Sequence, residues 1–277
     1  MDRRLCFRFD VDSHECLSAG SGPLIEAAAR LDVALTFFVN MGRATSRVRV
    51  LRSSWRVSPS HTATRLPTAR KLSRRGLVRL VLTNPRVGVA MGDHVRRIVD
   101  AGHEVGLHGG RNHRAWQESA HTWSADRLAT EIEWGLERLS EIGVDSPAGF
   151  ASPAWNSPSL LPEVARNCGF SYLADLHDPD SEGVRRDSII PNAVTNVIGE
   201  PGGVGFLEWH RARGATDVEI ETDFRRRLSK VRSLAVVYDH PFWAGRHDAN
   251  IVSRLMEVGL EEGFGIAALG EVVCQPS

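Results

Sequence analysis

Short apolar segments alternate with amphipathic ones along most of the chain, and this alternation constrains the fold more than any other feature. Seven segments are apolar runs of the length of strands: 5–10, 34–40, 103–108, 148–152, 170–175, 234–240 and 264–269. Six others carry apolar residues near the helical period: 22–31, 92–101, 125–142, 158–167, 220–232 and 249–262. Strands that alternate with helices predict a parallel sheet or barrel. Because 277 residues can form one α/β barrel, we predict a single domain over 1–277.

The stretch 41–91 interrupts this alternation and carries an unusual charge. It contains twelve arginines and lysines and neither aspartate nor glutamate. The whole chain has 34 basic and 34 acidic residues, so the remainder holds 22 basic and 34 acidic ones. We interpret 41–91 as a basic insertion into the barrel domain. Charge segregated in this way is typical of a surface that meets an anionic partner.

The composition indicates an ordinary globular protein. Hydrophobic residues make up 42% of the chain and charged residues 25%, which argues against disorder and against a fibrous fold. Its four cysteines are far apart and form no CxxC pair, so neither a disulfide framework nor a thiolate zinc site is expected. Without a signal-peptide pattern or an apolar run long enough to span a bilayer, the expected location is the cytoplasm.

Polar residues gather where the strand-like segments end. Asp10 and Asp12 end the first segment, His108 ends the third, Asp175 the fifth, and Asp239 and His240 the sixth. In α/β barrels the carboxyl ends of the strands form one rim, and active sites are built there. The sequence therefore predicts one rim site to which distant strands contribute.

The pair Asp10 and Asp12 is compatible with more than one chemistry. Acidic pairs serve divalent cations or acid–base catalysis. A phosphatase of the haloacid dehalogenase type would also begin with such a pair, as would the nucleotide-metal site of a glycosyltransferase. The phosphatase needs a phosphate-orienting lysine, and neither Lys71 nor Lys230, the two lysines of the chain, begins a suitable motif.

Asp12, His108 and His113 could together hold a metal ion. Two imidazoles and one carboxylate suit zinc or another first-row divalent ion. The two histidines are five residues apart, which places them about 140° apart around an α-helix. Either the glycine pair 109–110 loops out, or Asn112 occupies the place of the second ligand. We favour His113, because asparagine is a poor ligand for such an ion.

Five motifs occur in the order of a known family. "FRFDVDS", "GHEVGLHGGRNHRAWQ", "GFASPAW", "YLAD" and "VVYDHP" resemble those of the polysaccharide deacetylases, and the resemblance runs from about 5 to 270. It implies a distorted (β/α) barrel of about seven strands. "GHEVGLH" followed by "AWQ", together with "NMGR" at 40–43, is most similar to the formamido-arabinose-phosphoundecaprenol deformylases and related deacetylases of amino sugars on polyprenyl phosphates.

The resemblance implies catalytic roles for residues of the predicted rim. Asp10 is at the position of the general base, and Asp12, His108 and His113 are at those of the ligands to one divalent metal ion, expected to be zinc. His240 matches the general acid.

Two further positions bear on this catalytic set. Asp175 matches the carboxylate that orients the general acid, His240. Ala151 stands where most members carry an arginine that supports the base, a loss shared by the lipid-linked group.

The implied activity is removal of an N-formyl or N-acetyl group from an amino sugar, with the substrate on a polyprenyl phosphate at the inner face of the membrane. The segment 70–82, "RKLSRRGLVRLVL", mixes arginines with apolar residues as an interfacial helix does, so an anionic membrane surface is an expected partner. A solvated loop is the alternative. Nucleic acid is not expected, because only Trp55 lies among the charges. There are two alternative functions: deacetylation of a soluble amino sugar or polysaccharide, and a catalytically silent, metal-free role at the membrane.

Overall fold

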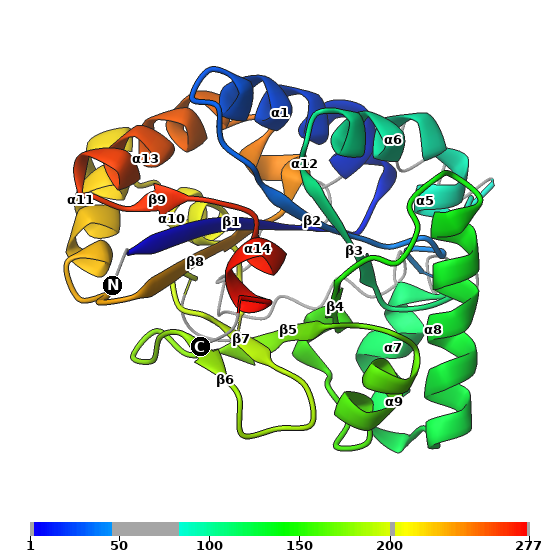
Figure 1. The fold of residues 1–277 in the computed structure, drawn as a ribbon. Helices are drawn as coiled ribbons and strands as arrows, with labels where there is room; N and C mark the ends of the chain where they lie inside the picture. Colours follow the sequence, from blue (N-terminus) through cyan, green and yellow to red (C-terminus); the bar gives the residue numbers. More distant parts are fainter. Residues whose placement is uncertain (1–2, 46–82, 200–202, 276–277) are drawn as a thin grey trace.

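A curled, mainly parallel sheet forms the centre of the molecule (Figure 1). The computed structural model describes residues 3–45, 83–199 and 203–275. Within these residues the sheet has nine strands: β1 (Arg4–Val11), β2 (Thr36–Val39), β3 (Glu104–His108), β4 (Gly149–Ala151), β5 (Tyr172–His177), β6 (Val184–Arg185), β7 (Asn192–Thr195), β8 (Leu234–Asp239) and β9 (Gly265–Ile266). Their order is β6-β7-β5-β4-β3-β2-β1-β8, and β9 pairs with β1 outside this path.

The two ends of the curled sheet approach one another beyond β7. Val197 donates its N–H to Val236 at 3.0 Å and accepts the N–H of Tyr238 at 3.1 Å. This bridge, together with hydrogen bonds between Asn196 and the backbone of β8, joins the chain leaving β7 to β8. The predicted distorted barrel is therefore confirmed, with seven parallel strands from β7 round to β8.

The predicted strand at 264–269 is not one of the seven barrel strands. The segment 264–269 forms only the two residues of β9, because α14 begins at Leu269. The seventh barrel strand is β7, which lies in a stretch where the sequence pattern predicted none.

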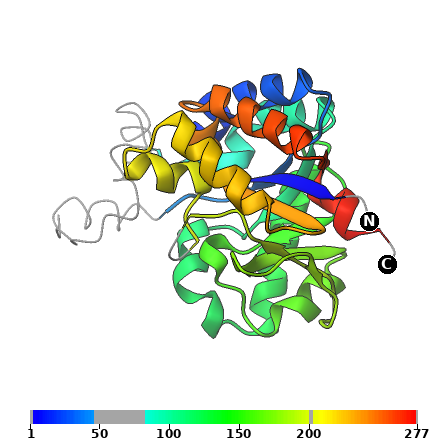
Figure 2. The ribbon, with the colours of Figure 1, turned by 90° about the vertical axis from the view of Figure 1, so that its left-hand side faces the viewer.

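Helices cover the outside of the curled sheet (Figures 1 and 2). They are α1 (Gly22–Ala29), α5 (Val87–Ala90), α6 (Gly92–Asp100), α7 (His113–Ser119), α8 (Ala125–Ser140), α9 (Leu161–Asn167), α10 (Phe206–Ala212), α11 (Asp217–Leu228), α12 (Pro241–Ala244) and α13 (Ala249–Glu261). The last helix, α14 (Leu269–Val273), packs instead against the inner face of the sheet, where its Leu269 and Val273 join the cluster that contains Cys6. The six predicted helices are all present. α11 begins three residues earlier than predicted, because Thr216 and Glu219 form a capping box. None of the described helices is long and apolar enough to cross a bilayer.

The alternation along β1 determines which side chains enter the barrel. Leu5, Phe7 and Phe9 belong to the large apolar core between the sheet and the helices. Cys6 belongs to a separate cluster that also contains Phe38 of β2 and side chains of β5 and β8. Because successive side chains of a strand point to opposite faces, Arg8 and Asp10 share the inner face with Cys6.

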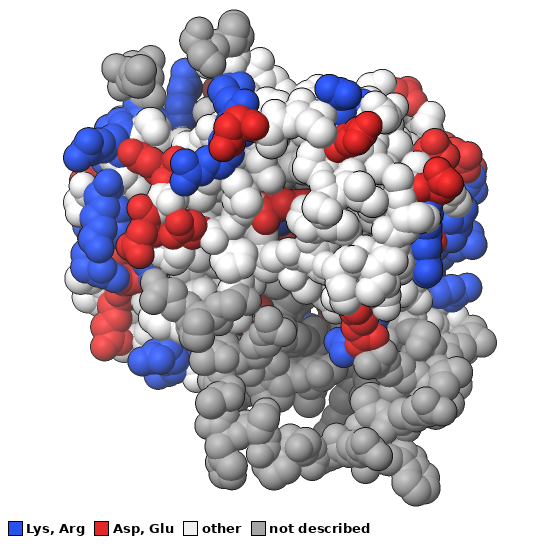
Figure 3. Space-filling model, turned by 90° about the horizontal axis from the view of Figure 1, so that it is seen from below, with Lys and Arg blue, Asp and Glu red and all other residues white. Residues whose placement is uncertain are grey.

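The basic insertion lies largely outside the described residues. Ten of its twelve cationic residues, and the segment 70–82 predicted as an interfacial helix, fall within 46–82. Its described flanks meet, since Arg43 and Arg86 form an antiparallel bridge and Val87 donates its N–H to Gly42 at 2.7 Å. On the part of the surface described in Figure 3, basic and acidic side chains are interspersed. The single domain over 1–277, with this insertion, stays a prediction.

Candidate active site

Three strand ends deliver polar side chains to one place on the rim. Asp10 lies near the end of β1 and Asp12 directly after it, His108 is the last residue of β3, and His240 follows β8. Asp10, His108 and His240 are buried. The side chains of these strand ends lie close together, since Asp12 is 3.2 Å from His108 and 3.4 Å from His240.

The loop after β3 brings His113 into the site. Gly109 has a φ of +76°, which favours glycine, and a Cβ atom there would lie 2.6 Å from Pro153. Asn112 caps α7, because its Oδ1 accepts the N–H of Ala115 at 3.0 Å. His113 is thus the first residue of α7, and residues 108–112 are not helical, so the helical period does not govern the spacing of the two histidines.

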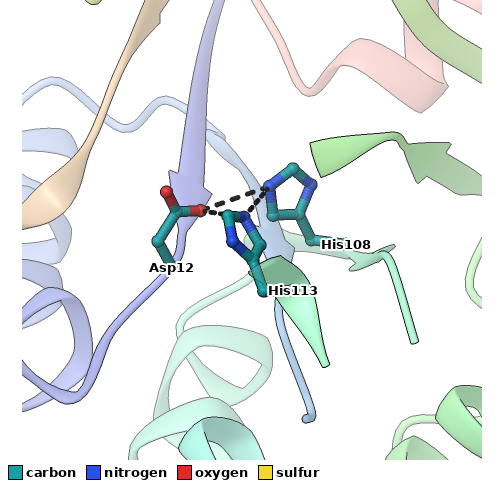
Figure 4. A group of neighbouring side chains, drawn as sticks. All are labelled: Asp12, His108 and His113. Carbon is teal, nitrogen blue, oxygen red and sulfur yellow. Dashed lines mark hydrogen bonds and ion pairs between the residues drawn. The ribbon is translucent and has the colours of Figure 1, made fainter. Parts of the chain in front are cut away.

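Asp12, His108 and His113 converge on one point (Figure 4). Asp12 Oδ1 lies 3.0 Å from His113 Nε2 and 3.2 Å from His108 Nε2, and the two Nε2 atoms are 3.2 Å apart. Burial alone would raise the pKa of Asp12, but the charge of His113 and hydrogen bonds from His108, His113 and His240 hold it well below its usual range. Of the two candidates, the side chain that faces Asp12 and His108 is that of His113, and Asn112 serves as the cap of α7.

This group of donors fits a divalent metal ion. His108 Nδ1 lies 2.8 Å from the carbonyl oxygen of Ala151, so in the neutral ring the hydrogen is on Nδ1 and the lone pair of Nε2 points to Asp12. One carboxylate oxygen and two imidazole nitrogens lie within 3.2 Å of one another, so a cation between them could be bound by all three. The set is of the mixed nitrogen and oxygen kind that first-row divalent ions prefer.

Arg8 holds Asp10, and the sequence analysis missed it. Arg8 is fully buried; its Nε donates to Asp10 Oδ1 at 3.0 Å and its Nη2 to Asp10 Oδ2 at 2.9 Å. Its Nη1 donates to the carbonyl oxygen of Ala174 and to Thr195 Oγ1. The guanidinium of Arg8 thus places a positive charge beside Asp10. At the position of Ala151, where the resemblance implies an arginine in most members, this chain has no charge. The sequence does contain an indication of this role, because Arg8 is a charged residue in an apolar strand, two positions before Asp10 and therefore on the same face.

His240 is held from both sides of its ring. Its Nδ1 lies 3.3 Å from Glu208 Oε2, and its Nε2 lies 3.1 Å from the hydroxyl of Tyr238 and 3.4 Å from Asp12 Oδ2. Burial opposes the charged form, but Asp12 and Glu208 outweigh it and raise the pKa of His240 well above its usual value. The two carboxylates thus favour the protonated form of the ring.

The expected role of Asp175 is corrected by these contacts. Asp175 accepts the N–H of Ser152 at 2.6 Å, the hydroxyl of Ser152 at 2.8 Å and that of Ser157 at 2.7 Å. It fixes the loop after β4, and the carboxylate at His240 is Glu208 of α10. The reason is topological, because β7 lies between β5 and β8 whereas α10 packs directly against β8.

A second cluster of possible donors lies behind His240. Glu208, Asp239 and His240 are within 4.8 Å of one another. The oxygens of Asp239 already accept the N–H of Leu207 at 2.5 Å and that of His240 at 2.9 Å. Burial and the charge of Glu208 raise the pKa of Asp239 to about 7. Asp239 thus connects the start of α10 to the end of β8, which places Glu208 beside His240.

A small cavity of about 100 Å³ opens onto these groups. Its lining residues are Asp12, His108, Gln117, Ala154, Trp155, Gly203, Val204, Glu208, Tyr238 and His240. Ala154 and Trp155 have φ angles of 52° and 60°, a conformation that costs non-glycine residues energy and is typical of functional sites. A cavity of this size admits a group of only a few non-hydrogen atoms.

Sequence comparisons relate the chain to deacetylases and deformylases. A sequence model of the polysaccharide deacetylase family matches residues 5–173. Over 173 residues the chain is 28% identical to a protein assigned as the 4-deoxy-4-formamido-L-arabinose-phosphoundecaprenol deformylase ArnD of Shewanella sediminis. The alignment covers 61% of this chain and 55% of that protein, so the chain spans about half the length of the curated relative it matches.

Solved structures share the fold. A structure from Mycobacterium smegmatis assigned to the polysaccharide deacetylases has a TM-score of 0.66 at 18% identity, covering 98% of this chain and 89% of that one. A family 4 carbohydrate esterase from Streptomyces lividans, solved with acetate, has 0.52 at 14%, covering 96% and 91%. A pseudoenzyme of the same esterase family from Bacillus anthracis has 0.55 at 14%, covering 98% and 66%. These likenesses concern the fold alone.

Proposed function

Because the chain belongs to the polysaccharide deacetylase family, we propose that it is a metal-dependent hydrolase that removes an N-formyl or N-acetyl group from an amino sugar. The observation that carries this proposal is the convergence of Asp12, His108 and His113 within 3.2 Å, with Asp10 and His240 beside them. These residues offer a cation site, a carboxylate base and an imidazolium acid in one place, which is what hydrolysis of an amide requires.

The chain's own residues would divide the reaction between them. A divalent ion at the site, zinc in our proposal, would lower the pKa of a water molecule and polarise the acyl carbonyl. Asp10 takes a proton from a water molecule, and the oxygen of this water forms a bond to the carbonyl carbon. The C–N bond then breaks, and His240 gives its proton to the leaving amine. The products are a free amino sugar and formate or acetate.

Two buried charges keep these groups in place. Arg8 engages both oxygens of Asp10, so the base has one orientation. Glu208 faces Nδ1 of His240, which leaves Nε2 directed to the cavity that Asp12 and His108 also line. Orienting a base and an acid in this way contributes to catalysis.

Substitution of Glu208 and of Asp175 should have different effects. Glu208→Gln keeps the shape but removes the charge beside His240, so we expect it to remove part of the factor of about 10²–10⁴ that a positioned acid contributes to kcat. Asp175→Asn should lower stability instead, by about 1–3 kcal/mol, because it disturbs buried hydrogen bonds to Ser152 and Ser157. Steady-state kinetics and thermal unfolding of both variants measure this. A larger loss of kcat in Asp175→Asn, with both variants folded, would restore Asp175 as the partner of the acid.

The substrate we propose is an amino sugar carried by a polyprenyl phosphate. The support is the similarity to the deformylase of Shewanella sediminis, together with the motifs "GHEVGLH", "AWQ" and "NMGR". The first residue of "NMGR", Asn40, contacts the site, because its Nδ2 donates to the carbonyl oxygen of Asp12 at 3.4 Å. We further propose that the protein acts at the cytoplasmic face of the membrane, with the basic insertion 41–91 against the anionic surface.

Mass spectrometry tests the substrate. Polyprenyl-phosphate amino sugars, N-formylated or N-acetylated, are incubated with zinc-loaded protein. A loss of about 28 or about 42 mass units would identify a formyl or an acetyl group replaced by hydrogen. Turnover of soluble N-acyl amino sugars only, or failure to pellet with anionic vesicles at low salt, would contradict the lipid-linked substrate and favour a soluble one. A protein that cannot be loaded with metal would favour a catalytically silent role.

A further inference from the structure

Tyr238 forms part of the cavity wall where the acyl group would lie, and no role described so far requires it. It is on the inner face of β8, two residues before His240, and its side chain lines the same cavity of about 100 Å³ as Asp12 and His108. Among the lining side chains it is the one that carries a hydroxyl group. Tyr238 is 5% exposed, so few water molecules compete for its O–H.

The orientation of the Tyr238 ring is restricted on several sides. The ring of Trp155 packs edge-on against it with centroids 5.1 Å apart, and the guanidinium carbon of Arg8 lies 5.3 Å from its centroid. The ring of His240 is 5.3 Å away. Burial and the charges of Asp10 and Asp12 raise the pKa of Tyr238 well above its usual value, so the phenol keeps its hydrogen.

The hydroxyl can contact His240 and a substrate at the same time. Its oxygen lies 3.1 Å from His240 Nε2. A phenol has one hydrogen to donate and lone pairs that accept. When the hydroxyl accepts a hydrogen bond from the Nε2–H of His240, its own hydrogen is available to a group in the cavity.

The geometry points to Tyr238 as a catalytic residue that donates a hydrogen bond to the acyl oxygen of the substrate as negative charge develops there. This inference rests on the proposed function. Tyr238 forms no covalent bond and transfers no proton. A donor fixed before the reaction is most effective in a buried site, and loss of one such donor costs about 10²–10³-fold in kcat.

A role through His240 is the competing explanation, and the leaving group separates the two. The amine of an amide must be protonated to depart, whereas 4-nitrophenolate leaves without a proton. Loss of a residue that acts only through His240 therefore slows the amide and spares 4-nitrophenyl acetate. Loss of a donor to the acyl oxygen slows both, because both reactions develop charge on that oxygen.

The experiment compares Tyr238→Phe with Tyr172→Phe, the chain's two tyrosines. Tyr172 is fully buried and donates to Glu104 at 2.7 Å, outside the cavity lining. We expect Tyr238→Phe to lower kcat about 10²–10³-fold on the N-acyl amino sugar and on 4-nitrophenyl acetate, with metal content unchanged. Tyr172→Phe should retain both activities, and His240→Ala should lose mainly the first. Full activity of Tyr238→Phe, or loss on the amide alone, would overturn the inference.

Binding of acetate to the metal-loaded protein keeps the inference separate from the proposed function. A wild type that hydrolyses neither substrate contradicts the proposed function. In that case calorimetric titration with acetate still decides on Tyr238, because the acetate oxygens take the place of the acyl oxygen. A loss of about tenfold or more in affinity confined to Tyr238→Phe supports the donor, and an unchanged affinity overturns it.

Discussion

Asp10→Asn is expected to lower kcat by about 10²–10⁴-fold while the protein keeps its metal ion. The asparagine retains the shape of the side chain and one oxygen that can accept from Arg8, but it cannot take a proton from water. Asp10 Oδ2 is 3.7 Å from His108 Nε2, farther than Asp12 Oδ1 at 3.2 Å, so Asp10 is a neighbour of the ligand group and not one of its members. Kinetics on the N-acyl amino sugar and elemental analysis of the purified variant are the two measurements.

Asp12→Asn is the matched control for this prediction. It changes the same type of side chain two residues along the chain, but in the group that faces both histidines. We expect it to lose metal as well as activity. If Asp10→Asn loses the metal and Asp12→Asn keeps it, the roles of the two aspartates are reversed.

Substitution of Asp10 is a cleaner test of the base than substitution of Arg8. Removal of the guanidinium would leave the Asp10 carboxylate buried without its counter-charge, and breaking a buried pair in this way costs about 3–5 kcal/mol. A variant of Arg8 would therefore combine loss of activity with loss of stability, whereas Asp10→Asn leaves a neutral side chain at the same place.

The residues that the sequence could place are those at the ends of parallel strands. Asp10, Asp12, His108 and His240 meet because the carboxyl ends of β1, β3 and β8 share one edge of the sheet. This follows from the βα alternation alone and needs no knowledge of how strongly the sheet curls. Arg8 was equally within reach, since strand alternation places it on the same face as Asp10.

Glu208 could not be placed by the same reasoning. It comes from α10, in the connection between β7 and β8, where the sequence pattern predicted neither β7 nor α10. Its contact with His240 depends on the route of that connection and on the hydrogen bond between Leu207 and Asp239. Asp175 was assigned in its place because it matches the family's motif, and no motif pointed to a carboxylate on a connecting helix.

The histidine spacing was misleading for a different reason. The helical period was applied to residues 108–113, but the helix begins only at His113. The intervening loop turns at Gly109, and Asn112 is occupied as the cap of α7. Asn112 therefore caps α7, whereas His113 faces Asp12, and substitution of each residue should have a different effect.

His113→Ala should lower the affinity for the metal by about 100-fold or more, because it removes a direct ligand and even outer partners of ligands contribute about 10–100-fold. Activity at a metal concentration that saturates the wild type should fall with it. Asn112→Ala should keep metal and activity but lose the cap of α7, which costs about 1 kcal/mol, or about 2–4 °C in Tm. Metal titration and thermal unfolding of the two variants give opposite patterns on this assignment. Loss of metal from Asn112→Ala, with His113→Ala still loaded, would show that the loop after β3 presents the asparagine to the ion and would remove the structural basis of the proposed metal site.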